Sequence, residues 1–392
     1  AAPKIKFFFS SLSEVWSNRL QCFVFTLATS GLLFVLFYGL LSLENFNLRN
    51  GQVPTFKARE SCDYTVGKWI PDTTSPMYNY SCSSIGDNQN CGLQNRQDTD
   101  YLYWKWKPDN CSLPRFDPDK FLRLLSNKKM LIVGDSLGRN QIESLVCMLS
   151  TVSSPSALEI HNGRRWTFSS HSFSATRLWS PCLVREAATP NNHPKLFLDD
   201  VDKTWASQIP LFDVIILSIG SWYPMDKLYY EGDVLLGCHN CPLFNATEVG
   251  FYYAYRKSLR TGLAAVKSRA RRDKRLHVVV NTTPVNHHID CPRTMPFAEG
   301  EKELDFMYQI TKKIAFEEVE AVNGHLDNSN VIIEAFDITS MTFMRPDAHP
   351  GPYKLPTHTA PEGAKDCLHW CMPGAIDTWN AILLKLIERQ AH

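Results

Sequence analysis

The stretch LIVGDSLGRNQIESLVCML, residues 131–149, joins an apolar run to a helix-like run through the turn Gly134-Asp135-Ser136. The pattern predicts a buried strand that ends at Gly134 and a helix that begins just after Ser136. A turn of this kind lies where α/β sheets bind their ligands, beside free N–H groups and the positive end of a helix dipole. Ser136 is therefore a candidate nucleophile, and a helix-capping serine is the simpler alternative.

Three more apolar runs of the same character follow along the chain. Together with the first they predict strands over 129–134, 212–220, 276–281 and 330–336, with helices near 139–149, 250–268, 301–322 and 375–388. Continuous apolar strands that alternate with helices are typical of a parallel sheet covered on both faces. We therefore predict a three-layer α/β/α domain over 128–392, with its site at the carboxyl ends of the strands.

The charge of the chain is balanced, at 41 Lys and Arg against 40 Asp and Glu in 392 residues. Proteins that bind nucleic acids normally carry a basic excess, so no nucleic-acid partner is expected. The densest basic run, residues 267–275, lies at the predicted end of a helix and is interpreted as a solvated surface.

An uncharged apolar run extends from Cys22 to Leu43. At about 1.5 Å per helical residue, it spans a hydrocarbon core of about 30 Å. Lys4, Lys6 and Arg19 outnumber the single acidic residue before it, which by the positive-inside rule keeps the N-terminus in the cytosol. We therefore expect a single-pass type II membrane protein with a cytosolic tail (1–20), a transmembrane signal anchor (21–43) and a polar stem (44–61), followed by luminal residues.

Eleven of the twelve cysteines follow the predicted anchor. Disulfides persist in secretory compartments, so these cysteines predict a disulfide framework. A zinc site is the alternative for Cys238-x-x-Cys241 and Cys367-x-x-x-Cys371, but no second pair stands at a finger-like spacing, so no metal is expected. Because eleven is odd, at least one thiol should be free or paired with another chain.

Residues 62–127 are rich in Pro, Asn and Gly, which predicts a loop-rich segment held by disulfides rather than an independent core. The disulfide candidates in the chain are Cys62, Cys82, Cys91, Cys111, Cys147, Cys291, Cys367 and Cys371. Sequons at Asn79, Asn110 and Asn245 are glycosylation candidates that fit a secretory route. A fourth sequon, at Asn281, directly follows an apolar run and is expected to be too buried for a glycan.

A serine nucleophile needs a base, and the best candidate lies in DCLHWCMPGAIDTWN, residues 366–380. Asp366 and His369 are three residues apart, so the carboxylate can hold one imidazole nitrogen while the other faces Ser136. Two cysteines flank the histidine, and disulfides through them would fix this segment. An isolated Asp-x-x-His pair is more often structural, but its combination with Ser136 on such a sheet favours catalysis.

The local pattern Gly134-Asp135-Ser136-Leu137-Gly138 also fits the G-x-S-x-G elbow of the α/β-hydrolases. That elbow normally follows a strand in the middle of the sheet, and its acid lies far from the histidine in sequence. Here the serine leads the sheet and the acid lies three residues from the histidine, so this alternative is disfavoured.

The stretches GDSLGRNQ (134–141) and DCLHWCMPGAIDTWN (366–380) resemble the two signature motifs of the plant trichome-birefringence-like proteins, relatives of the GDSL/SGNH esterases. The stretches CDYTVGKWIPD (62–72), YLYWKWKP (101–108) and FDPDKFL (116–122) resemble that family's N-terminal domain, so the similarity covers nearly all of 62–392. The resemblance implies an SGNH-hydrolase-like fold, a Golgi membrane location and polysaccharide O-acetyltransferase activity. It also implies that Ser136, Asp366 and His369 are catalytic, and that disulfides tie the N-terminal cysteines to the catalytic core.

Three residues are candidates for supporting the oxyanion that forms at Ser136. They are Arg139, Asn140 and Gly220, the last through its backbone N–H together with that of Ser136. In SIGSWYP (218–224), Gly220 and Trp222 match a motif of the resembled family, whereas Ser221 departs from it. An ordinary solvent-facing first helical turn is the alternative for Arg139 and Asn140.

The stretch DITSMTFMRPDAHPGPY (337–353) resembles a further family motif, in which Arg345, Asp347 and His349 would line or support the cleft. Trp222, Arg345 and Asp347 are accordingly candidates for substrate binding, and His349 is the rival of His369 as the base. Four aromatic residues also alternate as in a strand, with one face suited to the core and one to sugar rings: Tyr101, Tyr103, Trp104 and Trp106.

The expected reaction is transfer of an acetyl group through Ser136 to a polysaccharide hydroxyl, from a donor such as acetyl-CoA and with no bound cofactor. The stretch 237–263 resembles the xyloglucan and mannan branches of the family, so xyloglucan or glucomannan is the expected acceptor. The other expected partners are the membrane, through one helix, and a membrane protein that supplies the acetyl donor. Two alternatives stay open: an acetyl-esterase with the same three residues, and a non-catalytic protein that binds or bridges wall polysaccharide such as pectin.

Overall fold

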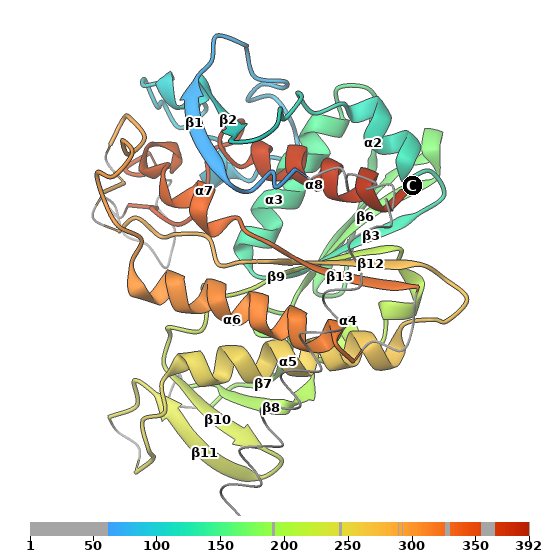
Figure 1. Cartoon of the computed structure of the whole chain (residues 1–392), viewed down its shortest axis with the longest axis vertical. Helices are drawn as coiled ribbons and strands as arrows, with labels where there is room; N and C mark the ends of the chain where they lie inside the picture. Colours follow the sequence, from blue (N-terminus) through green and yellow to red (C-terminus); the bar gives the residue numbers. More distant parts are fainter. Residues whose placement is uncertain are drawn as a thin grey trace, which may run out of the picture. The chain divides into compact units, whose positions relative to one another are not determined.

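A seven-stranded sheet forms the centre of the computed structural model (Figure 1). Its order is β13-β12-β9-β3-β6-β5-β4, with parallel neighbours from β13 to β6 and antiparallel neighbours from β6 to β4. The strands are β3 Lys129–Gly134, β4 Ser156–Ile160, β5 Gly163–Phe168, β6 Phe173–Trp179, β9 Val214–Ser218, β12 Leu276–Asn281 and β13 Val331–Phe336. The predicted α/β class is confirmed, but the sheet is mixed, because β4 and β5 are joined by a tight hairpin turn rather than by a helix.

The structure describes residues 62–189, 193–242, 245–288, 290–291, 293–325, 330–353 and 365–391. The expected cytosolic tail (1–20), anchor (21–43) and stem (44–61) lie outside these residues. Within the described part of the chain, no helix combines the length and the apolar character needed to cross a membrane.

Helices cover both faces of the sheet. Figure 1 shows α3 and α8 on one side of the sheet and α5 and α6 on the other. The helices are α2 Pro118–Leu124, α3 Ser136–Leu149, α4 Lys203–Ala206, α5 Phe251–Arg269, α6 Phe306–Asn323, α7 Thr339–Phe343 and α8 Asp377–Ala391. Short 3-10 turns cover Asp87–Gln89, Asp100–Leu102, Ser169–His171, Ile209–Leu211 and Pro346–Ala348.

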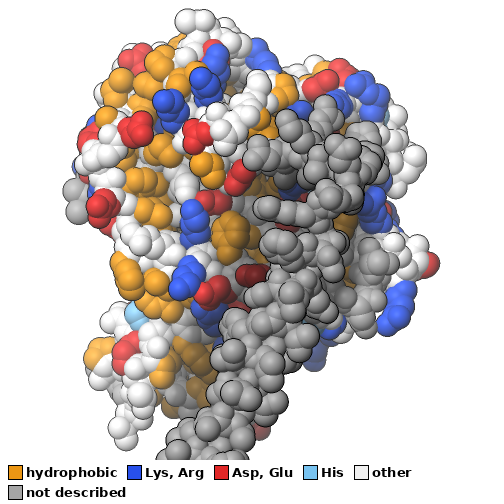
Figure 2. All heavy atoms as spheres, in the orientation of Figure 1, with side chains coloured by type: hydrophobic (Ala, Val, Ile, Leu, Met, Phe, Trp, Pro, Cys, Tyr) orange, Lys and Arg blue, Asp and Glu red, His pale blue; other side chains and the backbone are white. Residues whose placement is uncertain are grey.

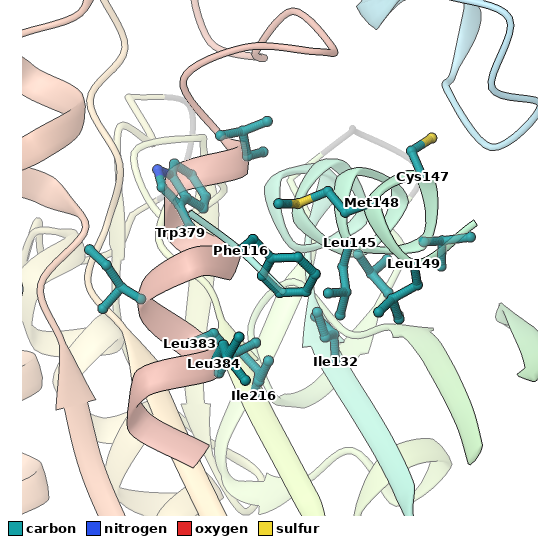
Figure 3. Packing of buried hydrophobic residues seen from close by; sticks show 14 of the residues in the cluster. Phe116, Ile132, Leu145, Cys147, Met148, Leu149, Ile216, Trp379, Leu383 and Leu384 are labelled. Carbon is teal, nitrogen blue, oxygen red and sulfur yellow. The ribbon is translucent and has the colours of Figure 1, made fainter. Parts of the chain in front are cut away.

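Alternate side chains of β3 enter two separate hydrophobic clusters. Ile132 packs with α3 and α8, whereas Leu131 and Val133 pack with the α5 and α6 side. Figure 3 shows the first cluster, in which side chains of α3 and α8 meet above the sheet. Period-two alternation of this kind is what a strand buried on both faces requires, and it explains the continuous apolar run.

A second sheet has the order β11-β10-β8-β7. Its strands are β7 Val184–Ala187, β8 Lys195–Val201, β10 Lys227–Glu231 and β11 Val234–His239. The sequence analysis did not predict this sheet, because its strands carry charged residues and exposed hydrophobic ones such as Val234. On the face that Figure 2 shows, Lys and Arg side chains are interspersed with Asp and Glu.

The N-terminal segment packs onto the α3 and α8 side of the central sheet. It contains one antiparallel pair, β1 Gly67–Pro71 and β2 Trp104–Pro108. Trp69, Tyr101 and Trp106 of this segment are buried in the same hydrophobic cluster as α3 and α8. The segment is therefore built into the core of the catalytic region rather than around a core of its own.

Three disulfides involve the N-terminal segment. One closes the segment on itself and two join it to the rest of the chain: Cys62–Cys111, Cys82–Cys147 and Cys91–Cys371. Two more lie elsewhere, Cys238–Cys241 and Cys291–Cys367. Both cysteine pairs for which zinc was the alternative therefore have their sulfurs in disulfides. Cys182 is the remaining free thiol among the described cysteines; it is buried, and burial raises its pKa to about 12.

Candidate active site

The turn between β3 and α3 places Ser136 at the carboxyl edge of the sheet. Gly134 has a φ of +156°, and a Cβ at this position would lie 1.8 Å from the carbonyl oxygen of Ser218 on β9. Only glycine allows so close an approach of two strands. The Asp135 carboxylate then caps α3 by accepting a hydrogen bond of 2.9 Å from the N–H of Leu137. The helix therefore begins at Ser136 itself, one residue before the start that the turn predicted.

Ser136, His369 and Asp366 form one chain of hydrogen bonds. The Oγ of Ser136 lies 2.8 Å from Nε2 of His369, and Nδ1 of His369 lies 2.8 Å from Oδ2 of Asp366. Asp366 accepts only, so Nδ1 carries the hydrogen and Nε2 is free to accept the Ser136 proton. The serine comes from the turn after β3 and the other two from a loop 230 residues later, and the structure brings together the three residues that the sequence analysis proposed as catalytic.

The Asp366 carboxylate is held in its charged form. Burial by itself would raise the pKa of Asp366, since the residue is only 6% exposed. Hydrogen bonds from the His369 side chain and from the backbone N–H groups of His369 and Leu368 outweigh burial and hold the pKa well below its usual range. A permanent negative charge is therefore available to stabilise the imidazolium that forms when His369 takes a proton.

Asn140 fixes the backbone next to His369. Its side-chain oxygen accepts a hydrogen bond of 2.7 Å from the N–H of Trp370, and its side-chain nitrogen donates one of 3.2 Å to the carbonyl of Trp370. Asn140 is fully buried, at the start of the second turn of α3. Because α3 also carries Ser136, this amide pair sets the distance between the serine and the histidine. The structure thus assigns Asn140 to positioning His369, and its amide is turned away from the oxyanion role that was expected.

His349, the rival base, lies behind His369 rather than beside Ser136. Its Nδ1 lies 2.6 Å from the carbonyl oxygen of His369, and its Nε2 lies 2.7 Å from Nδ1 of a second buried histidine, His287. The Nε2 of His287 in turn lies 2.9 Å from the carbonyl oxygen of Phe343. Both ring nitrogens of His349 are therefore engaged away from the serine, and His349 supports the backbone of the base.

The two buried histidines are one hydrogen atom short of a complete network. Carbonyl oxygens only accept, so both outer nitrogens must carry hydrogens, and two neutral rings have no hydrogen left for the contact between them. A third proton would complete the network. Burial opposes it, lowering the pKa of His287 to about 4 and that of His349 well below its usual value. Two neutral rings can therefore supply hydrogens to only two of the three contacts.

Disulfides and hydrogen bonds hold the loop that carries His369. Cys367 and Cys371, on either side of His369, bond to Cys291 and Cys91. Arg96 of the N-terminal segment donates hydrogen bonds of 2.8 Å and 2.7 Å to the carbonyls of His349 and Asp347. The N-terminal segment thus supports the loop that carries the base.

The structure contradicts the expectation that Arg345 and Asp347 bind substrate. Arg345 and Asp347 are 0% and 1% exposed, and their side chains pair with each other at 2.9 Å. The Arg345 guanidinium also donates to the carbonyl of Tyr101 and lies over the ring of Trp69. A charged pair with these partners joins the N-terminal segment to the loop, and a sugar chain cannot reach it.

Trp222 is half-buried at the carboxyl edge of the sheet, near the turn that carries Ser136. Its ring makes an edge contact with Trp179, with 5.4 Å between ring centroids. Trp179 is the register partner of Gly134, so this tryptophan pair lies beside the nucleophile turn. Gly220, with a φ of +139°, packs against Thr283, where a Cβ would lie 2.2 Å from Oγ1. The Arg139 side chain extends toward Glu143, one turn further along α3.

The four alternating aromatic residues divide between core and surface. Tyr101 and Trp106 are buried, whereas Tyr103 is 40% exposed. Trp104 is half-buried and lines a pocket of about 390 Å³ between the N-terminal segment and α8. The three sequons proposed for glycans, at Asn79, Asn110 and Asn245, are exposed, whereas Asn281 is 1% exposed, as expected.

Sequence reasoning missed Ser221 and His287. The Ser221 hydroxyl donates a hydrogen bond of 3.0 Å to the second oxygen of Asp135, so it completes the cap next to the nucleophile. Burial raises the pKa of Asp135, and this bond together with that from Leu137 opposes the rise. Ser221 attracted notice only because it departs from the resembled motif, and no local pattern marks His287 as the partner of a residue 62 positions away.

Two protein families match consecutive parts of the chain. The PMR5 N-terminal domain family matches residues 60–112, and the GDSL/SGNH-like acyl-esterase family found in Pmr5 and Cas1p matches residues 113–386. The chain belongs to the GDSL/SGNH-like acyl-esterase family. The Ser136 turn and the Asp366 to His369 segment both lie within the acyl-esterase match.

Known relatives are similar in sequence to this acyl-esterase family member along most of their own length. Xyloglucan O-acetyltransferase 2 of Populus trichocarpa is 46% identical over 84% of this chain and 82% of its own length. Xyloglucan O-acetyltransferase 1 of Arabidopsis thaliana is 42% identical over 84% and 80%, and protein trichome birefringence-like 26 of the same plant is 37% identical over 83% and 76%. The expected kinship with trichome-birefringence-like proteins is therefore confirmed.

Proposed function

We propose that the protein is a polysaccharide O-acetyltransferase that moves an acetyl group through a Ser136 acyl-enzyme to a hydroxyl of xyloglucan. The observation that carries this proposal is the hydrogen-bonded chain from Ser136 through His369 to Asp366, with 2.8 Å at each contact. The names of the xyloglucan O-acetyltransferases at 42–46% identity support the choice of reaction and acceptor.

In the first half of the reaction, the Ser136 oxygen attacks the acetyl carbonyl of the donor while its proton passes to Nε2 of His369. The bond from the acetyl carbon to the donor then breaks, and the leaving group takes the proton from His369. The oxyanion would lie against the first N–H groups of α3, which have no partner within the helix, and the N–H of Gly220 is the proposed second donor.

In the second half, the acceptor hydroxyl loses its proton to Nε2 of His369 and attacks the acetyl carbon of the acyl-enzyme. The ester bond to Ser136 breaks, and the proton returns from His369 to the serine oxygen. The Asp366 carboxylate stabilises the charged imidazole in both halves. Water in place of the sugar hydroxyl would make the same site an esterase.

The edge-on pair of Trp222 and Trp179 is the proposed platform for the acceptor. Both rings are half-buried beside the turn that carries Ser136. Apolar sugar faces stack on aromatic rings of this kind, and a neutral hemicellulose needs no charged partner there. We place the protein in the Golgi membrane through the anchor expected at 21–43, with the described residues in the lumen, where their disulfides persist.

The test is acetyl transfer by the purified protein. Incubation with an acetyl donor and deacetylated xyloglucan, glucomannan, xylan or pectin oligosaccharides should add the mass of one acetyl group to xyloglucan first. Ser136→Ala should give no transfer and no acetylated enzyme, whereas Ser144→Ala, a buried serine further along the same helix, should keep both. Loss of acetyl from pre-acetylated xyloglucan without any gain would instead establish an esterase, and transfer by Ser136→Ala would refute the mechanism.

A further inference from the structure

Three arginines converge on one side of the nucleophile turn. Arg164 on β5 and Arg177 on β6 are direct cross-strand partners, and Arg139 extends from the first turn of α3. Like charges placed directly opposite each other destabilise a sheet, so this arrangement has a cost in the folded state. The positive charge of each arginine affects Glu143, the acidic residue that they surround.

Arg177 is affected by the charges of Glu143 and Glu159, but only at a distance. Within the described residues, it forms no ion pair, and its Nε is buried without a hydrogen-bond acceptor. Among the described residues, the Nε of Arg139 is also buried without an acceptor, whereas that of Arg164 lies 3.1 Å from Oε1 of Glu159. Burial lowers the pKa of Arg177, which means that the folded protein holds this charge at a cost. Buried donors without acceptors are uncommon in folded proteins and call for an explanation.

The acidic residues nearby do not balance the three arginines. Glu143 reaches Arg139 only at 4.0 Å, and one of its buried carboxylate oxygens has no side-chain partner at hydrogen-bond distance in the described part of the chain. Burial raises the pKa of Glu143 to about 7, so this carboxyl is only partly ionised at neutral pH. Glu159 lies 3.1 Å from Arg164, but its side chain is 71% exposed, and such surface pairs contribute little. The cluster therefore keeps an excess of positive charge.

The cluster surrounds Glu143, seven residues along α3 from the reacting serine. Arg177 is the register partner of Ile132 on β3, just before the turn, and Arg139 follows Ser136 by one helical turn. Arg177 also precedes Trp179 by two residues, so both side chains leave β6 on the same face. An anion held here would lie beside the proposed acceptor platform, within reach of a flexible donor molecule whose acetyl group is at Ser136.

We propose that Arg139, Arg164 and Arg177 bind the phosphate groups of a coenzyme-A-type acetyl thioester while its acetyl group lies at Ser136. Guanidinium groups bind phosphate through paired N–H donors, and the side chains of Arg139 and Arg164 are 35% and 33% exposed, so an anion can reach their outer N–H groups. The inference rests on the proposed function, in which the acceptor is a neutral polysaccharide. An anion bound by the arginines must therefore belong to the acetyl donor. The long arm that joins the thioester to the phosphates in coenzyme A suits a site about two helical turns, or about 10 Å, along α3 from the nucleophile.

The test compares a charged and a neutral acetyl donor with the full-length protein. Transfer to xyloglucan oligosaccharides is measured with acetyl-CoA and with para-nitrophenyl acetate for the wild type, Arg164→Gln, Arg177→Gln and Arg165→Gln. Arg165 is the matched control, since it neighbours Arg164 on β5 but points to the opposite face. The first two variants should raise the KM for acetyl-CoA about tenfold and leave that for the neutral donor unchanged, because each removes a charge-assisted bond to phosphate. Arg165→Gln should change neither value.

Inorganic pyrophosphate supplies a second measurement that needs no variant. It should compete with acetyl-CoA in the wild type and leave transfer from para-nitrophenyl acetate untouched. Equal losses with both donors, or an unchanged KM for acetyl-CoA, would overturn the inference and indicate a structural role for the arginines. Wild-type transfer from the neutral donor alone would also overturn it while leaving the proposed function intact, and transfer from neither donor would refute both.

Discussion

The side-chain amide of Asn140 and the backbone of Trp370 form a closed pair of hydrogen bonds across 230 residues of sequence. One partner lies on the helix that starts with the nucleophile, and the other directly follows the base. The serine and the histidine are thereby held at 2.8 Å by a contact that involves neither of them. Productive geometry at such a site must be kept within a fraction of an ångström, so this contact is where the site is most sensitive to change.

Replacement of Asn140 by alanine should therefore damage activity more than folding. The variant leaves the N–H and the carbonyl of Trp370 buried without partners, which should lower the free energy of unfolding by about 2–4 kcal/mol. We expect kcat to fall about a hundredfold with little change in KM, because the distance between Ser136 and His369 is no longer fixed. Urea unfolding and steady-state kinetics measure the two effects, and normal kcat in a folded Asn140→Ala protein would contradict the positioning role.

Asp366→Asn should preserve the fold and remove most of the activity. An amide in place of the carboxylate favours the wrong tautomer of His369 and no longer stabilises its charged form. We expect kcat to fall on the order of a thousandfold to ten-thousandfold. The matched control is Asp337→Asn, which changes a buried carboxylate after β13 that binds Ser340 instead. A comparable loss in that control would show that the effect is structural.

His349→Phe tests the support behind the base. The phenyl ring can keep the contact with Trp370, where the His349 ring centroid now lies 4.2 Å away, but it cannot donate to the carbonyl of His369. We expect kcat to fall about tenfold, because the variant loses one hydrogen bond between uncharged groups. If His349 itself were the base, the loss would match that of His369→Ala, and this outcome would reverse the assignment.

Glu143→Gln should change how stability depends on pH. The Glu143 pKa is raised from 4.5 to about 7, so the unfolded chain loses this proton at lower pH than the folded protein does. Stability is therefore lost as pH rises from about 4.5 through about 7, by roughly 3 kcal/mol in total. Glutamine does not titrate. The difference in unfolding free energy between variant and wild type should accordingly grow by that amount between pH 5 and pH 8, and a constant difference would refute the assignment.

Removal of the bridge between Cys91 and Cys371 should affect both stability and catalysis. The double alanine variant loses a cross-link that closes 280 residues, which typically stabilises a protein by about 2–5 kcal/mol. Because Cys371 lies two residues after His369, kcat should fall as well. Alanine at both Cys62 and Cys111 is the control, since that bridge lies wholly within the N-terminal segment. Equal kcat losses in the two variants would argue against a local effect on the base.

The strands of the central sheet were predictable where burial on both faces leaves a continuous apolar run. β3 and β12 have the predicted bounds, 129–134 and 276–281. β5, next to the edge strand β4, escaped prediction because GRRWTF carries two arginines and most of its residues are only half-buried. A continuous apolar run indicates a strand that is buried on both faces. A strand with polar or functional side chains on one face does not show such a run.

The contacts of the candidate site were predictable only where both partners lie close together in the sequence. The spacing of Asp366 and His369 anticipated their hydrogen bond, because residues three apart on a tight loop can face each other. The burial of Arg345 could not be foreseen. The sequence does not show that the Arg345 guanidinium donates a hydrogen bond to the carbonyl of Tyr101, 244 residues earlier. Long-range partners decide whether a charged residue lines a cleft or lies inside the core.

The bridge between Cys91 and Cys371 also sets an order of events during biosynthesis. Cys91 is made 280 residues before its partner, so it remains a reactive thiol until nearly the whole chain has left the ribosome. Cys82, whose partner is 65 residues away, can be oxidised much earlier. The loop that carries the base is thus the last part of the site to be locked, and a chain that terminates before residue 371 lacks the bridge that fixes this loop to the N-terminal segment.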